Sequence, residues 1–149
     1  LFELGDKVWA KKIYKKVEGK AETSEDFSIL AKSICENLGD KEWGKKVYEK
    51  AEGKAEDSSD FLNLADSIHE QLGDKEWAEK NYKKAADKAE DFSDFSGLAD
   101  SIHEKLGDKE LLKEVYSKVA EKAEYSSDFR HLADSRILRA ACRVRHLHC

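Results

Sequence analysis

The apolar residues of this chain recur at spacings of three and four, which is the pattern of amphipathic α-helices. One stretch has apolar residues at Phe61, Leu64, Ala65, Ile68 and Leu72. The buried side of a second stretch is marked by Trp77, Ala78, Asn81, Tyr82, Ala85 and Ala89. Gly73 and Asp74 lie between the two stretches, where a left-handed C-terminal residue and an N-cap are expected. Ser58 or Ser59 is expected to cap the first of these helices.

The same pair of stretches recurs along the chain at a fixed period. The motif Leu-Gly-Asp-Lys begins at Leu4, Leu38, Leu72 and Leu106, each 34 residues after the last. This spacing predicts a first type of helix over 25–37, 59–71, 93–105 and from 127 onward. It predicts a second type over 6–22, 40–56, 74–90 and 108–124. A fixed period in this range is typical of arrays whose units bury one another's apolar sides.

The predicted fold is all-α, an α-solenoid of antiparallel helix pairs, because short connections force consecutive helices to reverse direction. Residues 1–135 form the array, of about four units, and the first unit lacks its first helix. Residues 136–149 form an atypical basic C-terminal tail. Two aromatic rows are predicted to belong to the core: Trp9, Trp43 and Trp77, and Tyr14, Tyr48, Tyr82 and Tyr116.

Small residues are expected where the two helices of a unit cross, because they let the backbones approach closely. The residues at this position are Ala10, Gly44 and Ala78. In the last unit Leu112 takes the same position, which predicts looser packing there.

The composition agrees with exposed helices and excludes several classes of partner. Charged residues make up 40% of the chain, and Pro is absent. Residues 1–129 carry 22 Lys against 31 Asp and Glu, so nucleic acid is a poor partner on electrostatic grounds. No run of 18 apolar residues occurs, so no membrane partner is expected. The three Cys have no disulfide-framework spacing, which favours a reduced, cytoplasmic setting.

Several motifs resemble the tetratricopeptide repeat family, whose unit is also a 34-residue helix–turn–helix. The second helix of that family carries a pattern matched here by Gly73-Asp74, Ala78, Tyr82 and Ala85. Phe61, Leu64, Ala65 and Ile68 lie where its first helix carries Trp, Leu, Gly and Tyr. The Pro that ends the family's second helix is absent, and one extra residue lies between the helices. Related two-helix repeat families have similar spacing.

The resemblance covers residues 4 to about 135 and implies a right-handed superhelix with a 34-residue repeat. It also implies a concave surface, lined by the first helices, that binds extended peptides or partner helices. It does not imply catalysis.

The candidate binding surface is the non-core face of the first helices, where equivalent positions lie about 10 Å apart. Its partner-binding residues are Lys32, Leu62, Asn63, Asp66, His69, Ser96, Asp100, His103, Arg130 and Asp134, and Cys35 is expected on the same face. Three aspartates, Asp66, Asp100 and Asp134, form an expected acidic row, so a bound peptide is expected to be basic. The alternative is that these aspartates are solvated surface positions kept by duplication.

Metal or catalytic chemistry has little support. Asp66 with His69, and Asp100 with His103, place a carboxylate and an imidazole on one helical face, but solvated side chains are the simpler reading. In the tail, Cys142, His146, His148 and Cys149 are weak candidates for metal ligands. The tail is otherwise interpreted as a reading-frame change, vector-derived sequence or a natural capping helix. No cofactor motif or nucleophile constellation is present, so the chain is not expected to be an enzyme.

The sequence therefore predicts a protein–protein interaction scaffold that binds a peptide or partner helix. One alternative is self-association through exposed repeat ends, because Trp9 and Val17 lack a covering first helix. Another is an engineered or selected repeat protein with no small-molecule activity.

Overall fold

The described part of the chain is entirely helical. The computed structural model describes residues 4–125 and residue 143. Its elements are α1 (Leu4–Glu18), α2 (Ser24–Leu38), α3 (Lys41–Lys54), α4 (Ser58–Leu72), α5 (Lys75–Lys88), α6 (Phe92–Ser101), the π-helical turn η1 (Ile102–Leu106) and α7 (Lys109–Tyr125). No strand occurs among these residues, so the all-α prediction is confirmed for them. The first-type helix predicted from 127 onward lies outside the described residues.

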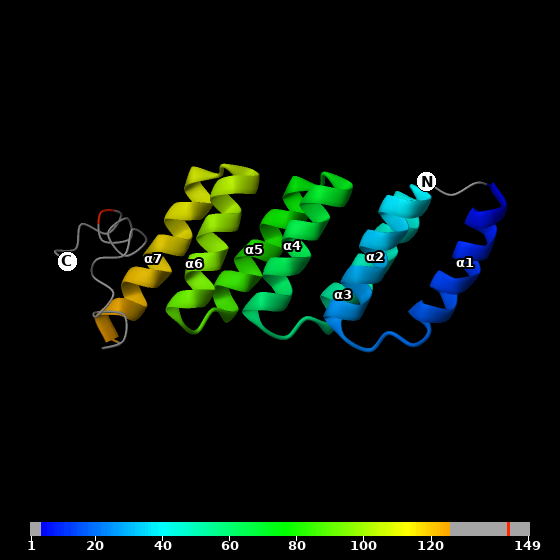
Figure 1. Cartoon of the computed structure of the whole chain (residues 1–149). Helices are drawn as coiled ribbons and strands as arrows, with labels where there is room; N and C mark the ends of the chain where they lie inside the picture. Colours follow the sequence, from blue (N-terminus) through cyan, green and yellow to red (C-terminus); the bar gives the residue numbers. More distant parts are fainter. Residues whose placement is uncertain (1–3, 126–142, 144–149) are drawn as a thin grey trace.

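The helix pairs stand in a row, with α1 at one end and α7 at the other (Figure 1). The chain reverses direction between successive helices, and α2 packs closely on α3 as α4 does on α5. Neighbouring pairs also touch, because α4 contacts both α2 and α6. The structure thus confirms that adjacent helix pairs pack together.

Glycine corners end three of the helices as the sequence predicts. Gly39, Gly73 and Gly107 have left-handed φ angles of 67°, 68° and 62°. After two of these corners, Asp40 and Asp74 accept hydrogen bonds from the backbone N–H groups of Trp43 and Trp77, at 3.1 and 3.0 Å. Each corner therefore stops one helix and caps the next.

The corner predicted at Leu4-Gly5-Asp6 is wrong. Helix α1 begins at Leu4, so Gly5 and Asp6 belong to its first turn. No neighbouring atom lies within 4 Å of the place where a Cβ on Gly5 would stand. The same space is open at Gly39, Gly73 and Gly107, so it does not decide whether a corner forms.

The predicted serine caps are also wrong. Helix α4 is capped by Asp57, whose side chain accepts a hydrogen bond from the backbone N–H of Asp60 at 2.8 Å. Ser58 is buried instead, and its hydroxyl donates to the carbonyl oxygen of Ala85 at 3.0 Å. Thr23 and Asp91 cap α2 and α6 in the same manner as Asp57. The serine thus ties the start of α4 to the end of α5.

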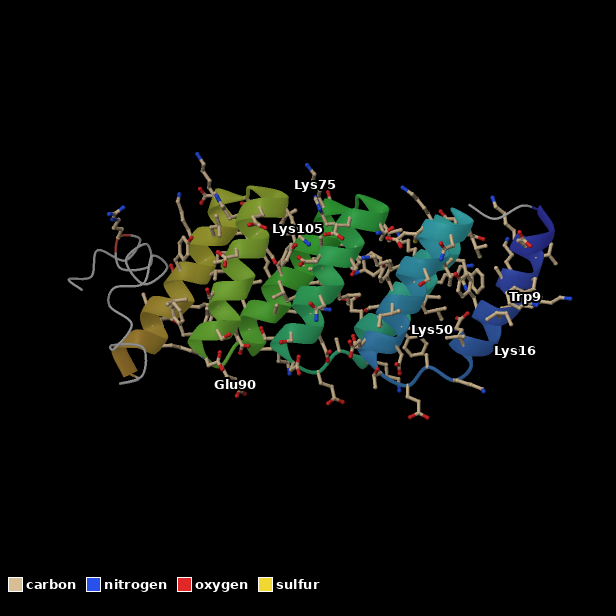
Figure 2. All side chains as sticks on the ribbon, viewed as in Figure 1. Trp9, Lys16, Lys50, Lys75, Glu90 and Lys105 are labelled. Atoms are coloured by element: carbon tan, nitrogen blue, oxygen red, sulfur yellow. The ribbon has the colours of Figure 1, made fainter. Side chains whose placement is uncertain are left out.

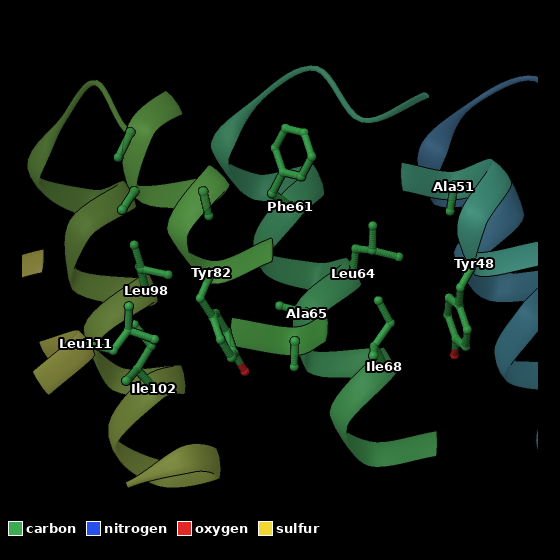
Figure 3. Close-up of a cluster of buried hydrophobic side chains, with 14 of the residues drawn as sticks. Tyr48, Ala51, Phe61, Leu64, Ala65, Ile68, Tyr82, Leu98, Ile102 and Leu111 are labelled. Carbon is green, nitrogen blue, oxygen red and sulfur yellow. The ribbon is translucent and has the colours of Figure 1, made fainter. Parts of the chain in front are cut away.

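The core runs continuously between the helix pairs and contains large side chains from both helix types (Figure 3). Tyr48 and Tyr82 are fully buried, whereas Trp43 and Trp77 are half-buried and pack against the core. The prediction that Trp9 belongs to the core is wrong, because its side chain is 66% exposed. Helix α1 stands at the end of the row, so no described helix covers its outer side.

The close crossings occur at the small residues that the sequence indicates. Gly44 and Ala78 are buried where α3 meets α2 and α5 meets α4. The larger Leu112 is buried at the equivalent position of α7, and α6 with η1 packs less extensively on α7. The facing helix changes from α- to π-helical turns at Ile102. The less extensive contact agrees with the looser packing that the sequence predicts at Leu112.

Two glycines of α3 test whether close approach sets this spacing. A Cβ on Gly44 would lie 2.2 Å from the Sγ of Cys35, whereas a Cβ on Gly53 would meet nothing within 4 Å. We therefore expect Gly53→Ala to raise the free energy of unfolding by up to about 1 kcal/mol. Gly44→Ala is expected to lower it by about 1–3 kcal/mol through overpacking. Denaturant unfolding of both variants measures the contrast.

The clash with the Cys35 thiol has its own control. Adding Cys35→Ala to Gly44→Ala removes the Sγ and should recover most of the lost stability. A Gly44→Ala variant as stable as Gly53→Ala would contradict the assignment of Gly44 to a tight crossing.

Candidate functional site

A hollow of about 360 Å³ lies between the outer sides of α2 and α4. We call it the α2–α4 groove, and it is lined by Ser24, Glu25, Ser28, Ile29, Lys32, Asp60, Asn63, Asp66 and Ser67. Three residues of the predicted binding surface, Lys32, Asn63 and Asp66, therefore lie together in it. Helix packing positions them, because α2 and α4 lie side by side in neighbouring units.

The groove combines an apolar side chain with polar groups. Ile29 is 60% exposed, and it is one of the few large apolar side chains exposed on the described surface. Asn63 is exposed beside it and carries an amide that both donates and accepts hydrogen bonds. Glu25, Asp60 and Asp66 contribute three carboxylates against the single ammonium of Lys32. The groove is thus mildly acidic, with one apolar contact point.

Besides Asp66, two of these charged groups already have partners. The Nζ of Lys32 lies 3.9 Å from the Oε1 of Glu36, one turn along α2. The carboxylate of Asp60 accepts a hydrogen bond from the backbone N–H of Glu56 at 3.0 Å. Glu25 is exposed and is the least constrained carboxylate of the groove.

Asp66 is held by side chains from three other parts of the chain. The Tyr82 hydroxyl donates to its Oδ1 at 2.5 Å, and the Ser101 hydroxyl donates to its Oδ2 at 3.2 Å. Lys105 lies 3.0 Å from the same Oδ2. Burial raises the pKa of Tyr82, and the hydrogen bond to the Asp66 carboxylate raises it further. Asp66 therefore joins α4 to α5, α6 and η1.

The expected acidic row needs correction for this reason. Asp66 is half-buried and ion-paired, whereas Asp100 is exposed. The third member, Asp134, lies outside the described residues. Equivalent positions in the repeat thus have different surroundings, and the described aspartates do not form a set of equally free carboxylates.

Lys105 completes this network. Its Nζ lies 2.6 Å from the Oε1 of Glu70 as well as near Asp66. Burial by itself would lower the pKa of Lys105, but the bonds to Glu70 and Asp66 outweigh it and raise the pKa. The hydrogen bond from Lys105 in turn lowers the pKa of Glu70 below its ordinary value of 4.5. The two helices α4 and α6 with η1 are thereby joined across their outer sides.

The sequence reasoning missed this network, although a signal for it exists. Glu70 and Lys105, Asp66 and Ser101, and Glu36 and Gln71 are each 35 positions apart, one more than the repeat. A donor that follows a carboxylate by one repeat plus one residue therefore marks contacts between successive first-type helices.

The remaining predicted residues are scattered along the row. Leu62 is half-buried, and its Cδ2 lies 3.6 Å from the place of a Cβ on Gly97, so it fills the contact between α4 and α6. Ser96 and His69 are half-buried, and His103 is exposed. Cys35 was expected on this face but is buried against Gly44, where burial raises the pKa of its thiol. Six candidates lie outside the described residues: Arg130, Asp134, Cys142, His146, His148 and Cys149.

The described residues contain no group of three or more His, Cys, Asp and Glu side chains placed to hold a metal ion. None of the described helices is long and apolar enough to cross a membrane. No family model, curated protein or solved structure matches this chain. The resemblance to tetratricopeptide repeats therefore stays a prediction from the sequence.

Two equivalent tyrosines provide a matched test of the Asp66 network. The Tyr82 hydroxyl donates to Asp66, whereas the buried Tyr48 hydroxyl has no hydrogen bond to any described residue, although Ser67 lies beside it. We expect Tyr82→Phe to lower the free energy of unfolding by about 1–2 kcal/mol, because it removes a bond to a charged acceptor. Tyr48→Phe is expected to cost clearly less than Tyr82→Phe, since the buried Tyr48 hydroxyl has only the neutral Ser67 side chain beside it and no charged acceptor.

Denaturant unfolding of the two variants measures the difference. Equal losses from both substitutions would contradict the view that Asp66 stabilises the Tyr82 hydroxyl.

The Glu70–Lys105 pair predicts a dependence of stability on pH. Because the folded pKa of Glu70 lies below 4.5, the pair stabilises the fold above the unfolded pKa. This contribution is lost as the pH falls through the folded pKa. We expect Glu70→Gln to flatten the fall in unfolding free energy between about pH 5 and pH 3.

Glu104→Gln is the matched control, because Glu104 is exposed and has no ion pair with a described residue. Urea unfolding at several pH values compares the two variants with the unsubstituted chain. A slope unchanged by Glu70→Gln would contradict the prediction.

Proposed function

We propose that this chain is a helical-repeat interaction module that binds a protein segment in the α2–α4 groove. The observation that carries the proposal is the meeting of Ile29, Asn63 and Lys32 in one hollow between neighbouring units. In this proposal the array is a right-handed α-solenoid of the tetratricopeptide type. The starts of α2, α4 and α6, at Ser24, Ser58 and Phe92, support a unit of 34 residues.

The groove favours an extended peptide with one apolar and one basic side chain. An apolar side chain of the peptide gains contact with Ile29, and a basic one approaches Glu25 and Asp60. The Asn63 amide offers both a donor and an acceptor, which suits a peptide backbone. Charge gives such a complex its discrimination and association rate more than its affinity. A scaffold or adaptor needs this kind of moderate, selective binding.

A cytoplasmic location is part of the same proposal. Cys35 is a free cysteine buried inside the helix pair, which suits a reducing compartment.

Peptide display on the intact chain tests the proposal. We expect selected peptides to be enriched in Lys or Arg next to an apolar residue. For a selected peptide, Ile29→Ser and Asn63→Ala should each weaken binding about fivefold or more by calorimetry. Lys80→Ala, an exposed change on α5 away from the groove, is the control and should leave binding unchanged. Failure to select any peptide, or selected peptides indifferent to both groove variants, would contradict the proposed function.

A further inference from the structure

The second-type helices are joined by a recurring arrangement of one carboxylate and two donors. The Glu18 carboxylate of α1 accepts from the Trp43 indole Nε1 at 3.0 Å and from Lys50 Nζ at 2.6 Å. One unit later, the Glu52 carboxylate of α3 accepts from Trp77 Nε1 at 2.8 Å and from Lys84 Nζ at 2.5 Å. We call this arrangement the carboxylate clamp, in which one helix gives the acceptor and the next helix gives both donors.

The clamp has the same register in both places. Its tryptophan follows its glutamate by 25 residues, and its lysine follows by 32. Burial raises the pKa of Glu18, but the hydrogen bonds from Lys50 and Trp43 outweigh it, and the pKa lies below its ordinary value. The carboxylate is thus charged in a half-buried place, where charge-assisted hydrogen bonds are strong and directional.

At the third interface the indole and its acceptor are both absent, whereas the clamp lysine is kept as Lys118 and pairs with Asp87 instead. At the positions that follow Glu52 and Trp77 by one repeat, the chain carries Ala86 and Leu111. Both are buried, at 5% and 2% exposure. The acceptor and the indole are therefore replaced together by apolar groups. An indole N–H at this position goes with a carboxylate on the preceding helix.

Helix α1 carries the donor half of a clamp without its acceptor. Trp9 and Lys16 occupy the positions of Trp43 and Lys50, and both stand on α1 at the end of the row (Figure 2). The Trp9 side chain is 66% exposed, with the exposed Val8 and Val17 on the same helix. No hydrogen bond or ion pair joins the Trp9 or Lys16 side chain to another described residue.

The chain itself shows what covers this face elsewhere. The equivalent face of α5 is covered by the α3–α4 hairpin, residues 41–72, which supplies Glu52 and the apolar side of α4. This hairpin carries five Lys against eight Asp and Glu, whereas α1 carries five Lys against Asp6 and Glu18. An acidic hairpin is therefore complementary in charge to α1.

A second copy of this chain fits the face poorly. If two copies met through their α1 helices, the five lysines of one helix would repel the five lysines of the other. At the other end of the row, the clamp position of α7 is Ala120, which is buried and has no carboxylate. Among the described residues, neither end of a second copy offers the acceptor.

We propose that the outer face of α1, formed by Trp9, Lys16 and Val17, docks an acidic helical hairpin. A glutamate on that hairpin accepts hydrogen bonds from the Trp9 indole and the Lys16 ammonium. Apolar side chains of the hairpin cover Trp9 and Val17, because the repeat equivalents of Val17, Ala51 and Ala85, are fully buried.

Calorimetry with the full chain and a synthetic peptide of residues 41–72 tests the proposal. We expect one peptide to bind per chain, and Glu52→Gln in the peptide to weaken binding about fivefold or more. Trp9→Phe in the chain keeps an aromatic six-membered ring and removes the indole N–H, so it should cost a similar factor. The two changes together should cost little more than either one, because they break the same hydrogen bond.

Lys16→Ala and Lys12→Ala form the matched pair for charge. Both remove one exposed lysine from α1, but only Lys16 has the clamp register. We expect Lys16→Ala to weaken binding and Lys12→Ala to leave it within about twofold, the effect expected of a distant exposed charge.

A second test joins the hairpin covalently to the chain, so that binding no longer requires the free peptide to fold by itself. Placing a second copy of residues 41–72 directly before Gly5 keeps the repeat register and holds the hairpin at high effective concentration. This chain should unfold at a higher guanidinium concentration than the original. In the fused chain, Glu52→Gln in the added copy should remove part of that gain, and so should Trp9→Phe. In the original chain, Trp9→Phe should leave the unfolding midpoint unchanged.

Two results would overturn the proposal. One is a fused chain whose unfolding midpoint does not rise or does not respond to Glu52→Gln in the added copy. The other is sedimentation showing that the full chain forms a dimer that Trp9→Phe abolishes, because a second copy would then be the occupant.

Discussion

The close crossing of the two helices within each pair sets the distance at which every other contact of this protein is made. Gly44 and Ala78 let the backbones approach until the Cys35 thiol, in the first case, fills the remaining space. At that distance Tyr48 and Tyr82 are fully buried, although each pair alone has too little interior to enclose them. Where the larger Leu112 stands at the crossing, the facing helix changes to π-helical turns. Interior packing thus fixes the spacing, and the polar contacts between units follow from it.

Equivalent positions in this array differ in chemistry while keeping their geometry. One unit before Asp66, the equivalent position carries Lys32. Asp66 accepts a hydrogen bond from the Tyr82 hydroxyl, but the equivalent Tyr48 hydroxyl has no carboxylate acceptor. The clamp of Glu52 and Trp77 becomes the apolar contact of Ala86 and Leu111 one unit later. The second difference removes the indole donor and its acceptor together, since an unpaired buried polar group is costly, whereas the Tyr48 hydroxyl stays buried without a charged acceptor. The array is therefore a regular frame with distinct local surfaces.

The two proposed binding surfaces use different parts of this frame. The α2–α4 groove lies along the row and offers an exposed apolar side chain, an amide and a mildly acidic border. The outer face of α1 closes one end of the row and offers a basic surface with an indole donor. Their opposite charges suit different partners, a basic peptide in the groove and an acidic hairpin on α1. Binding at one surface leaves the other uncovered, which suits a scaffold.

The sequence by itself determined the helix types, their approximate bounds and the glycine corners, because these depend on local periodicity and on backbone conformations that few residues adopt. It also indicated the tight crossings, since the small residues recur in register. Only the tertiary structure decided that Asp66 is held by Tyr82 and Lys105, and that Ser58 is buried while Asp57 caps. It also decided between the two expectations for Trp9, a core position and an uncovered one, in favour of the second. These outcomes depend on contacts between residues 16 to 39 positions apart or on the lack of a neighbour. The spacing of apolar residues within one helix shows which side of the helix is apolar. It does not show which residues pack against that side, or whether any do.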